Sequence, residues 1–295
     1  MTDASGGDPL QCFFVSDLHG RKARYEKLFE AIERERPEAV FIGGDLLPHG
    51  SFHGGGLGPG FTGPLEEYLV PRLEALRERL GPAWPSVFVI LGNDDGRLEE
   101  EAVIEAAGKG LWDYVHGRSV PWGEWTVHGY AYVPPTPFRL KDWERYDVSR
   151  FVDPGCVSPE EGVRTVQVPE REMRYRTIRE DLEALAAGAD MERGLFLFHS
   201  PPYRTKLDRA ALDGRKVEGV PVDVHVGSIA IKGFIEIRQP LLTLHGHVHE
   251  SASLTGAWRD QIGRTHCFNA AHDGPELALV RFDPRDPAAA TRDLL

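Results

Sequence analysis

Short apolar runs alternate with amphipathic stretches along the N-terminal part of the chain. Three of these runs have the length of a β-strand: residues 11–16, 39–43 and 87–91. Between the first two, apolar side chains recur at the spacing of one helix face, as Tyr25, Leu28, Phe29 and Ile32. Residues 65–80 follow a helical pattern before the third run. This alternation predicts a parallel sheet built of βαβ units.

The alternation resumes in the second half of the chain. It predicts strands at residues 125–132, 195–198, 241–244, 264–268 and 277–282. A helix is expected over residues 228–238, with Ser228 as its N-cap. We therefore predict an α/β fold of two β-sheets packed face to face, with helices outside. A single domain is expected over residues 11–295, behind a disordered tail of residues 1–10.

Three long segments do not follow this alternation. They are residues 48–63, 134–176 and 203–227. The first is rich in glycine and is predicted to be a mobile loop over the functional site. The second mixes proline, tryptophan and charge without a clear period, which favours an insertion or a lid. The third is predicted to be a polar connection. Loops of this length in a compact domain are usually functional or disordered.

Charge and cysteine content narrow the class of protein. The net charge is −12, which disfavours a nuclease or another nucleic-acid binder because such proteins depend on clustered Lys and Arg. No apolar run is long enough for a transmembrane helix, and no segment resembles a signal peptide. Cys12, Cys156 and Cys267 form no C-x-x-C pair. We expect Cys12 and Cys267 to be small buried residues, and the protein to be cytoplasmic.

Seven metal-binding side chains follow the expected strands in a fixed order. They are Asp17, His19, Asp45, Asn93, His199, His247 and His249. Taken alone, Asp45 could cap a helix, Asn93 favours turns, and a lone His199 is more often structural. The ordered set is more specific than any of its members. Because ligands collect beyond the carboxyl ends of parallel strands, we expect the residues that follow the first three strands, from Asp17 to Asn93, to meet in space.

The order of these residues resembles the calcineurin-like metallophosphoesterase family, whose pattern reads D-x-H, G-D, G-N-H-D/E, H and G-H-x-H. The matching segments are Asp17-Leu18-His19, Gly44-Asp45, Gly92-Asn93, His199 and Gly246-His247-Val248-His249. The resemblance spans residues 11–270. It implies a four-layer sandwich, two β-sheets flanked by helices, with a dinuclear metal centre at one edge.

The resemblance also assigns the ligands by position. The first metal would be held by Asp17, His19, Asp45 and His249, and the second by Asp45, Asn93, His199 and His247, with Asp45 bridging both. Manganese or iron would be typical occupants and zinc is possible, because carboxylate, imidazole and amide donors suit these ions. A hydroxide between the ions would attack phosphorus in line. The implied substrate is a small phosphate ester, and the oligomeric state stays open.

The chain departs from the family pattern at Asp94, where many members have histidine. That histidine usually stabilises the transition state or protonates the leaving group. An aspartate anion would repel a phosphate, so Asp94 is expected to turn away or to be protonated. This departure favours a phosphodiesterase acting on a small or nucleotide-like substrate. The alternatives are a phosphomonoesterase or protein phosphatase with another acid, and a non-catalytic scaffold, which the complete ligand set disfavours.

Further candidates lie near the last ligands. His225 precedes the expected helix N-terminus, a natural site for phosphate, and is our candidate for a catalytic substrate contact or replacement acid. Arg204 and Lys206 could hold a phosphate oxygen, although a solvated surface role is the ordinary alternative. His245 and Asn269 could support the metal ligands or pack in the core.

Overall fold

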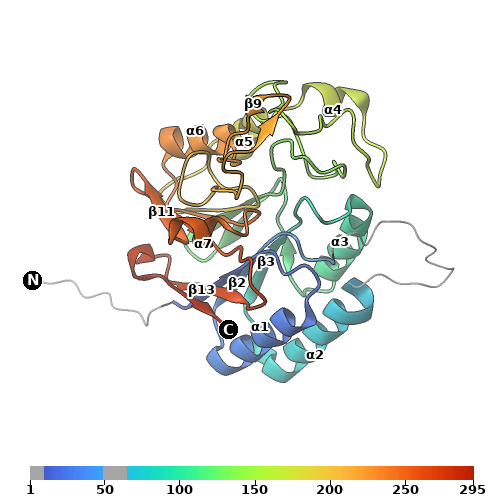
Figure 1. The fold of residues 1–295 in the computed structure, drawn as a ribbon. Coiled ribbons are helices and arrows are strands. Elements are labelled where there is room, and N and C mark those ends of the chain that lie inside the picture. Colours follow the sequence, from blue (N-terminus) through green and yellow to red (C-terminus); the bar gives the residue numbers. More distant parts are fainter. Residues whose placement is uncertain (1–9, 49–64) are drawn as a thin grey trace, which may run out of the picture.

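The computed structural model describes residues 10–48 and 65–295, whose strands form two six-stranded sheets and a small hairpin (Figure 1). The first sheet has the strand order β14-β13-β1-β2-β3-β4. Its strands are β1 (Cys12–Val15), β2 (Ala39–Gly43), β3 (Ser86–Ile90), β4 (Asp113–Tyr114), β13 (Ala278–Phe282) and β14 (Thr291–Leu294). The parallel pairing of β1, β2 and β3 confirms the predicted βαβ units.

The second sheet has the strand order β11-β12-β10-β7-β6-β5. Its strands are β5 (Ser119–Trp122), β6 (Trp125–Tyr130), β7 (Gly194–Phe198), β10 (Leu242–His245), β11 (Arg259–Ile262) and β12 (Thr265–Asn269). The four inner strands pair in parallel, and β5 and β11 are antiparallel strands at the two edges. The hairpin consists of β8 (Lys216–Val217) and β9 (Val220–Pro221).

Aromatic side chains from the two sheets meet in the space between them. Phe41 of β2 stacks on Phe88 of β3, with 5.2 Å between the ring centroids, and meets Trp122 of β5 edge-on at 6.1 Å. Phe268 of β12 lies 6.0 Å from Phe282 of β13. Such pairs add to the free energy gained from burying their apolar area. The two sheets therefore share one core, as the prediction of face-to-face packing requires.

Helices cover the outer sides of the sheets (Figure 1). They are α1 (Lys22–Glu35), α2 (Val70–Leu80), α3 (Glu100–Gly108), α4 (Glu170–Tyr175), α5 (Ile178–Leu185), α6 (Ile229–Arg238) and α7 (Ser251–Thr255). α1 packs beside α2, and α5 beside α6. The expected face of α1 is buried, and Ser228 caps α6 by accepting the N–H of Ile231 at 3.0 Å. Two sheets flanked by helices make this an α/β fold of four layers.

The segment of residues 134–176 buries charged side chains in addition to the fully buried Trp143. Lys141 and Glu144 form a fully buried ion pair. Arg145 pairs with Glu172 at 2.5 Å and with Asp181 of α5. Because Asp181 belongs to α5, Arg145 joins the segment to a helix that covers the second sheet.

Three further predictions concern the N-terminal tail and the glycine-rich loop, the burial of two cysteines, and membrane-spanning helices. The tail of residues 1–10 and the loop of residues 48–63 lie outside the described residues, apart from Leu10 and Pro48. Cys12 and Cys267 are fully buried in β1 and β12, as expected. Within the described ranges, no helix has the length and apolar character needed to cross a membrane.

Candidate metal centre

The seven predicted metal-binding side chains all lie just beyond the ends of strands. They are Asp17 and His19 after β1, Asp45 after β2, Asn93 after β3, His199 after β7, and His247 and His249 after β10. β1, β2 and β3 are parallel neighbours in one sheet, and β7 and β10 in the other. Their carboxyl ends therefore form one edge in each sheet, and the side chains from both edges converge.

Four of these residues form a compact cluster. One ligand atom from each of Asp17, His19, Asp45 and His249 lies within 4.8 Å of the others. The Nε2 atoms of His19 and His249 are 3.0 Å apart, and Nε2 of His249 is 3.1 Å from Oδ1 of Asp17. With metal–ligand bonds of about 2.0–2.2 Å, donor atoms of one ion stand about 3 Å apart. The cluster therefore fits a single metal ion.

A second group adjoins the first through Asp45. Nε2 of His199 lies 3.3 Å from Oδ2 of Asp45 and 3.0 Å from Oδ1 of Asn93. Oδ2 of Asp45 also lies 3.8 Å from Nε2 of His19, which belongs to the first cluster. The ring of His247 is 5.3 Å from that of His199. Asp45 thus stands between the two groups, where a bridging carboxylate would have to be.

Hydrogen bonds from the main chain orient the donors. Nδ1 of His199 lies 2.7 Å from the carbonyl oxygen of Gly43, so an N–H there leaves the Nε2 lone pair for a cation. The N–H of His247 donates to both carboxylate oxygens of Asp17, at 3.0 and 3.1 Å. The N–H of Asp94 donates to Oδ1 of Asp45 at 2.9 Å. Each carboxylate is thereby held in place by the chain that carries another ligand.

The backbone at the ligands is strained. Asp17, His19, Asp45 and His247 have φ values of 57°, 48°, 52° and 72°. Such left-handed backbone costs a non-glycine residue roughly 1–3 kcal/mol and tends to cluster at functional sites. Gly92 is required for close packing, because a Cβ atom there would lie 2.3 Å from Oδ1 of Asp45. The fold maintains an unfavourable local conformation in order to bring these side chains together.

Burial and charge shift the pKa values in opposite directions within the cluster. Burial alone would raise the pKa of Asp17, but its hydrogen bond with His249 lowers that pKa to about 2. Burial alone would lower the pKa of His199, but the carboxylate of Asp45 raises it to about 10. Burial beside His199 lowers the pKa of His247 to about 3. The carboxylates thus stabilise positive charge at this edge of the sheets. Protons and metal cations would compete for the same side chains.

The family follows from comparison of the whole sequence. The family model described as calcineurin-like phosphoesterase matches residues 11–251. The chain belongs to this family. Together, the family and the cluster of Asp and His side chains suggest a dinuclear metal site. The donor types, carboxylate, imidazole and amide oxygen, also fit such a site in a phosphoesterase.

Solved structures confirm the fold of this phosphoesterase. TT1561 of Thermus thermophilus has a TM-score of 0.55 at 17% identity, over 97% of this chain and 99% of that chain. Phosphopantetheinyl hydrolase of Mycobacterium tuberculosis has a TM-score of 0.53 at 12% identity, over 92% of each chain. A dimetal phosphatase of Danio rerio has a TM-score of 0.50 at 12% identity, over 94% of each chain. No curated protein matches the sequence. At these identities the similarity shows the fold alone.

Asp94, the departure of this phosphoesterase from the family pattern, lies at the metal centre. Its Oδ2 atom is 3.7 Å from Nδ1 of His19, and its side chain is 24% exposed. Asp94 does not turn away, which was one of the two expectations. Burial, followed by the charges of Asp45 and Asp95, raises the pKa of Asp94 to about 8. In the metal-free protein this shift favours the other expectation, a protonated carboxyl.

Asp95 is a residue of the site that sequence reasoning missed. Its buried carboxylate accepts the N–H groups of Leu46 at 3.1 Å, Leu47 at 2.8 Å and Gly92 at 2.8 Å. It thereby ties the loop after β2, which carries Asp45, to the loop after β3, which carries Asn93. The residues alone give no signal of this role, because Asn and Asp are common in turns, but the acidic last position of the family pattern G-N-H-D/E falls on Asp95.

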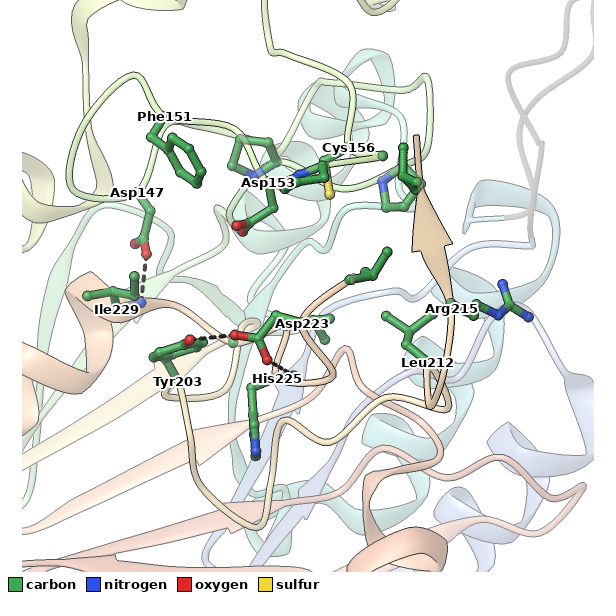
Figure 2. A pocket seen from close by; sticks show the side chains of 18 of the residues that line it. Asp147, Phe151, Asp153, Cys156, Tyr203, Leu212, Arg215, Asp223, His225 and Ile229 are labelled. Atoms are coloured by element: carbon green, nitrogen blue, oxygen red, sulfur yellow. Dashed lines mark hydrogen bonds between the residues drawn. The ribbon is translucent and has the colours of Figure 1, made fainter. Parts of the chain in front are cut away.

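His225 is oriented by a carboxylate, but the adjoining helix end is not free for phosphate. Nδ1 of His225 lies 2.9 Å from Oδ1 of the fully buried Asp208. At the N-terminus of α6, the carboxylate of Asp147 accepts from Ser228 Oγ at 2.6 Å and from the N–H of Ile229 at 2.6 Å. Figure 2 shows the contact between Asp147 and Ile229. A carboxylate of the chain itself therefore fills the expected phosphate site.

The remaining candidates take structural positions. His245 is fully buried between the Ser200 carbonyl at 2.9 Å and the Thr243 hydroxyl at 2.7 Å. Asn269 donates to the Leu207 carbonyl at 3.0 Å and contacts no metal-binding side chain through a hydrogen bond in the described part of the chain. Arg204 lies over the ring of Tyr203, and Lys206 is exposed at the surface.

Proposed function

We propose that this phosphoesterase hydrolyses phosphodiesters of small or nucleotide-like alcohols with the help of two divalent metal ions. The seven side chains after the strands would be the metal ligands, with Asp45 bridging the two ions, and manganese or iron would be the usual occupants. Such a pair of ions supplies an activated water at neutral pH and neutralises charge on the phosphoryl oxygens. The compartment in which the protein works would be the cytoplasm.

The observation that carries the preference for diesters is the position of Asp94. Its carboxyl group stands at the partly exposed side of the cluster, 3.7 Å from His19. A phosphate monoester carries more than one negative charge at neutral pH, because its second pKa is about 6. A phosphodiester carries a single negative charge. Two bound cations would favour the ionised form of Asp94 in the loaded enzyme, and that anion would disfavour the monoester more than the diester.

The chain's own residues would perform the remaining tasks. The strained loops hold the carboxylates and imidazoles in place before any substrate arrives, so little reorganisation is needed during the reaction. His225 is proposed as a substrate contact, because Asp208 fixes its ring through Nδ1 and leaves Nε2 for a substrate oxygen. The amide of Asn93 would complete the second metal site beside His199.

The test compares hydrolysis of bis-p-nitrophenyl phosphate with that of p-nitrophenyl phosphate in the presence of added Mn²⁺. We expect a higher kcat/KM for the diester, and no activity above background in the Asp45→Asn variant. A higher kcat/KM for the monoester would contradict the diester preference and leave a phosphomonoesterase. Hydrolysis of neither ester by metal-loaded protein would contradict both activities.

A further inference from the structure

A cavity of about 790 Å³ lies between the segment of residues 134–176 and the connection of residues 203–227 (Figure 2). Most of its lining is apolar, with Pro135, Pro137, Val148, Phe151, Leu212 and Val226 as examples. Sites for small organic ligands usually have volumes of about 300–1,000 Å³ and such a lining. None of the seven metal-binding side chains lines it, so the cavity is a site separate from the metal centre.

The cavity adjoins the metal centre through two short links. Tyr203, in its wall, follows His199 by four residues, a path that spans at most about 14 Å when fully extended. On another side, Leu212 in the wall follows Ala211, whose N–H donates to the carboxylate of Glu250 at 3.1 Å. Glu250 is the residue after His249. A ligand of nucleotide size could therefore occupy the cavity while its phosphate lies at the metals.

Carboxylates stand among the polar groups of the wall. The carboxylate of Asp223 accepts the Tyr203 hydroxyl at 2.6 Å and the N–H of His225 at 2.9 Å. The carboxylate of Asp153 makes no hydrogen bond within the described part of the chain, and burial and the charge of Asp223 raise its pKa. The two cations of the wall are Lys216, in the exposed hairpin, and Arg215, just before it, and Arg215 extends away from these carboxylates in Figure 2. The part of the wall that carries Asp153 and Asp223 repels anions and accepts hydrogen bonds from N–H and O–H groups.

The apolar part of the wall is left open to solvent. Phe151 is 69% exposed and Ile229 is 48% exposed, although both line the cavity. Figure 2 shows the ring of Phe151 on the side of the cavity opposite Tyr203 and His225. An exposed apolar surface of this kind on a soluble protein commonly marks a binding site. A ligand with a flat or bulky apolar group would cover both side chains.

We propose that this cavity binds one ester arm of the phosphodiester substrate: an uncharged organic group with an apolar body and hydrogen-bond donors. The inference rests on the proposed function, because it assigns the cavity to the substrate of the metal centre. It excludes nucleic acids and alcohols that carry further phosphates, whose charges the acidic wall would repel. It also assigns a purpose to the segment of residues 134–176, which supplies one side of the cavity.

The test uses the full-length, Mn²⁺-loaded protein and three diesters that all release p-nitrophenolate. Their second arms are p-nitrophenyl, methyl and p-carboxyphenyl. Phe151→Ala and Ile229→Arg should each raise KM for the p-nitrophenyl diester about tenfold with little change in kcat, because apolar contact with the arm is lost. The ratio of variant to wild-type KM should stay near one for the methyl diester. In the wild type, the p-carboxyphenyl diester should have a KM about tenfold above that of the p-nitrophenyl diester.

Ile237→Arg is the matched control, because Ile237 lies on the same helix, is 81% exposed and does not line the cavity. Equal changes of KM for the methyl and p-nitrophenyl diesters, or no change for either, would overturn the cavity assignment while diester hydrolysis stands. The cavity assignment would also be overturned if light scattering showed a wild-type dimer that Ile229→Arg converts to a monomer. A second copy of the chain would then cover the cavity.

Absence of any diester hydrolysis would instead contradict the proposed function. In that case, binding of the uncharged fluorophore N-phenyl-1-naphthylamine to the metal-free protein tests whether the cavity binds uncharged apolar groups. Fluorescence that Phe151→Ala and Ile229→Arg abolish, and Ile237→Arg does not, supports a site for uncharged apolar groups. Absence of fluorescence in the wild type overturns the cavity assignment as well.

Discussion

The metal centre and the segment of residues 134–176 both bury charged side chains, but they balance those charges in different ways. In the segment, Arg145 pairs with Glu172 and Asp181, and Lys141 pairs with Glu144. At the centre, no Lys or Arg side chain in the described part of the chain pairs with the carboxylates of Asp17, Asp45 or Asp95. The nearby guanidinium of Arg24 donates instead to main-chain carbonyl oxygens, including that of Asp17.

The charges of the segment are compensated within the chain and stabilise the fold, whereas those of the centre are compensated fully only when a cation binds. A buried charge is costly unless a partner or a metal compensates it. The pairs of the segment are complete, so removing one member leaves the other charge buried and alone. The centre has an excess of carboxylates that histidines alone offset, so an added cation stabilises it. The same kind of residue is thus expected to affect stability in one region and activity in the other.

The largest expected effect is that of Asp45→Asn. Losing the carboxylate between the two metal groups should lower kcat/KM for bis-p-nitrophenyl phosphate by at least about 1,000-fold. Removing a residue that only supports a metal ligand already lowers activity about 10–100-fold, and losing a ligand itself should cost more. The metal-free variant should unfold at the same urea concentration as the metal-free wild type, or at a higher one. Mn²⁺ at 100 times its Kd should stabilise the wild type by about 2.7 kcal/mol and the variant much less. Equal stabilisation of both proteins by Mn²⁺ would exclude Asp45 as a ligand.

The second largest effect is expected for Asp181→Asn, which should lower stability and leave activity nearly unchanged. Asp181 accepts hydrogen bonds from Arg145, Arg176 and the buried Tyr130 hydroxyl. Asp181→Asn should lower the free energy of unfolding by about 3 kcal/mol, because it leaves Arg145 buried without its full complement of charge. The folded variant should keep its kcat within about threefold. Glu183→Gln, on the exposed side of the same helix, is the control for urea denaturation. A large loss of kcat with unchanged stability would place Asp181 in the active site.

The strands of the fold were predictable where the chain gives a local apolar signal. β2 has the expected bounds, Ala39–Gly43, and α6 begins after its expected cap, Ser228. The edge strand β11 was missed because its alternating, partly exposed residues, Arg259–Ile262, form no apolar run. The pairing of β1 with β13, which sets Cys12 opposite Phe282, depends on contacts between distant parts of the chain. No local pattern encodes such a pairing.

The site was predictable for a related reason. The rule that ligands collect at the carboxyl ends of parallel strands placed Asp17, Asp45 and Asn93 together without any knowledge of distances, whereas His199 was assigned by the resemblance to the family pattern. The left-handed backbone at Asp17 and Asp45 could not be foreseen, because non-glycine residues rarely adopt it and only the finished fold imposes it. The contact of Asp147 with α6 joins residues about eighty positions apart and likewise has no sequence signal.

A buried histidine tests whether an uncompensated charge is costly outside the metal centre. Nε2 of His128 is buried without a hydrogen-bond partner in the described part of the chain, and its ring stacks on Phe196 at 4.3 Å. Burial lowers the pKa of His128 to about 4. The unfolded chain therefore binds a proton below about pH 6.5 that the folded chain does not.

It follows that the stability due to neutral His128 is complete above about pH 6.5 and is lost as the pH falls toward 4. Between pH 7.5 and 5.5 this single group should cost the wild type about 1.4 kcal/mol. His128→Phe keeps the stacked ring without the titration, so its free energy of unfolding should fall less over the same interval. Urea denaturation of the metal-free proteins at both pH values measures the difference. Parallel pH profiles would show that His128 is protonated in the fold without penalty.

The smallest expected effect concerns Asp94, which is partly exposed while Asp17, Asp45 and Asp95 of the centre are buried. Asp94→His places an imidazole where many family members carry one, and removes a carboxyl group 3.7 Å from His19. It should raise kcat/KM for p-nitrophenyl phosphate about tenfold, because general acid catalysis and a lower negative charge both favour the monoester. Asp94→Asn separates these causes, since it removes the charge without adding an acid, and should give a gain of about threefold. If neither variant gains on the monoester, Asp94 does not set the preference, and the acidic cavity wall near Asp153 and Asp223 becomes the remaining source of discrimination.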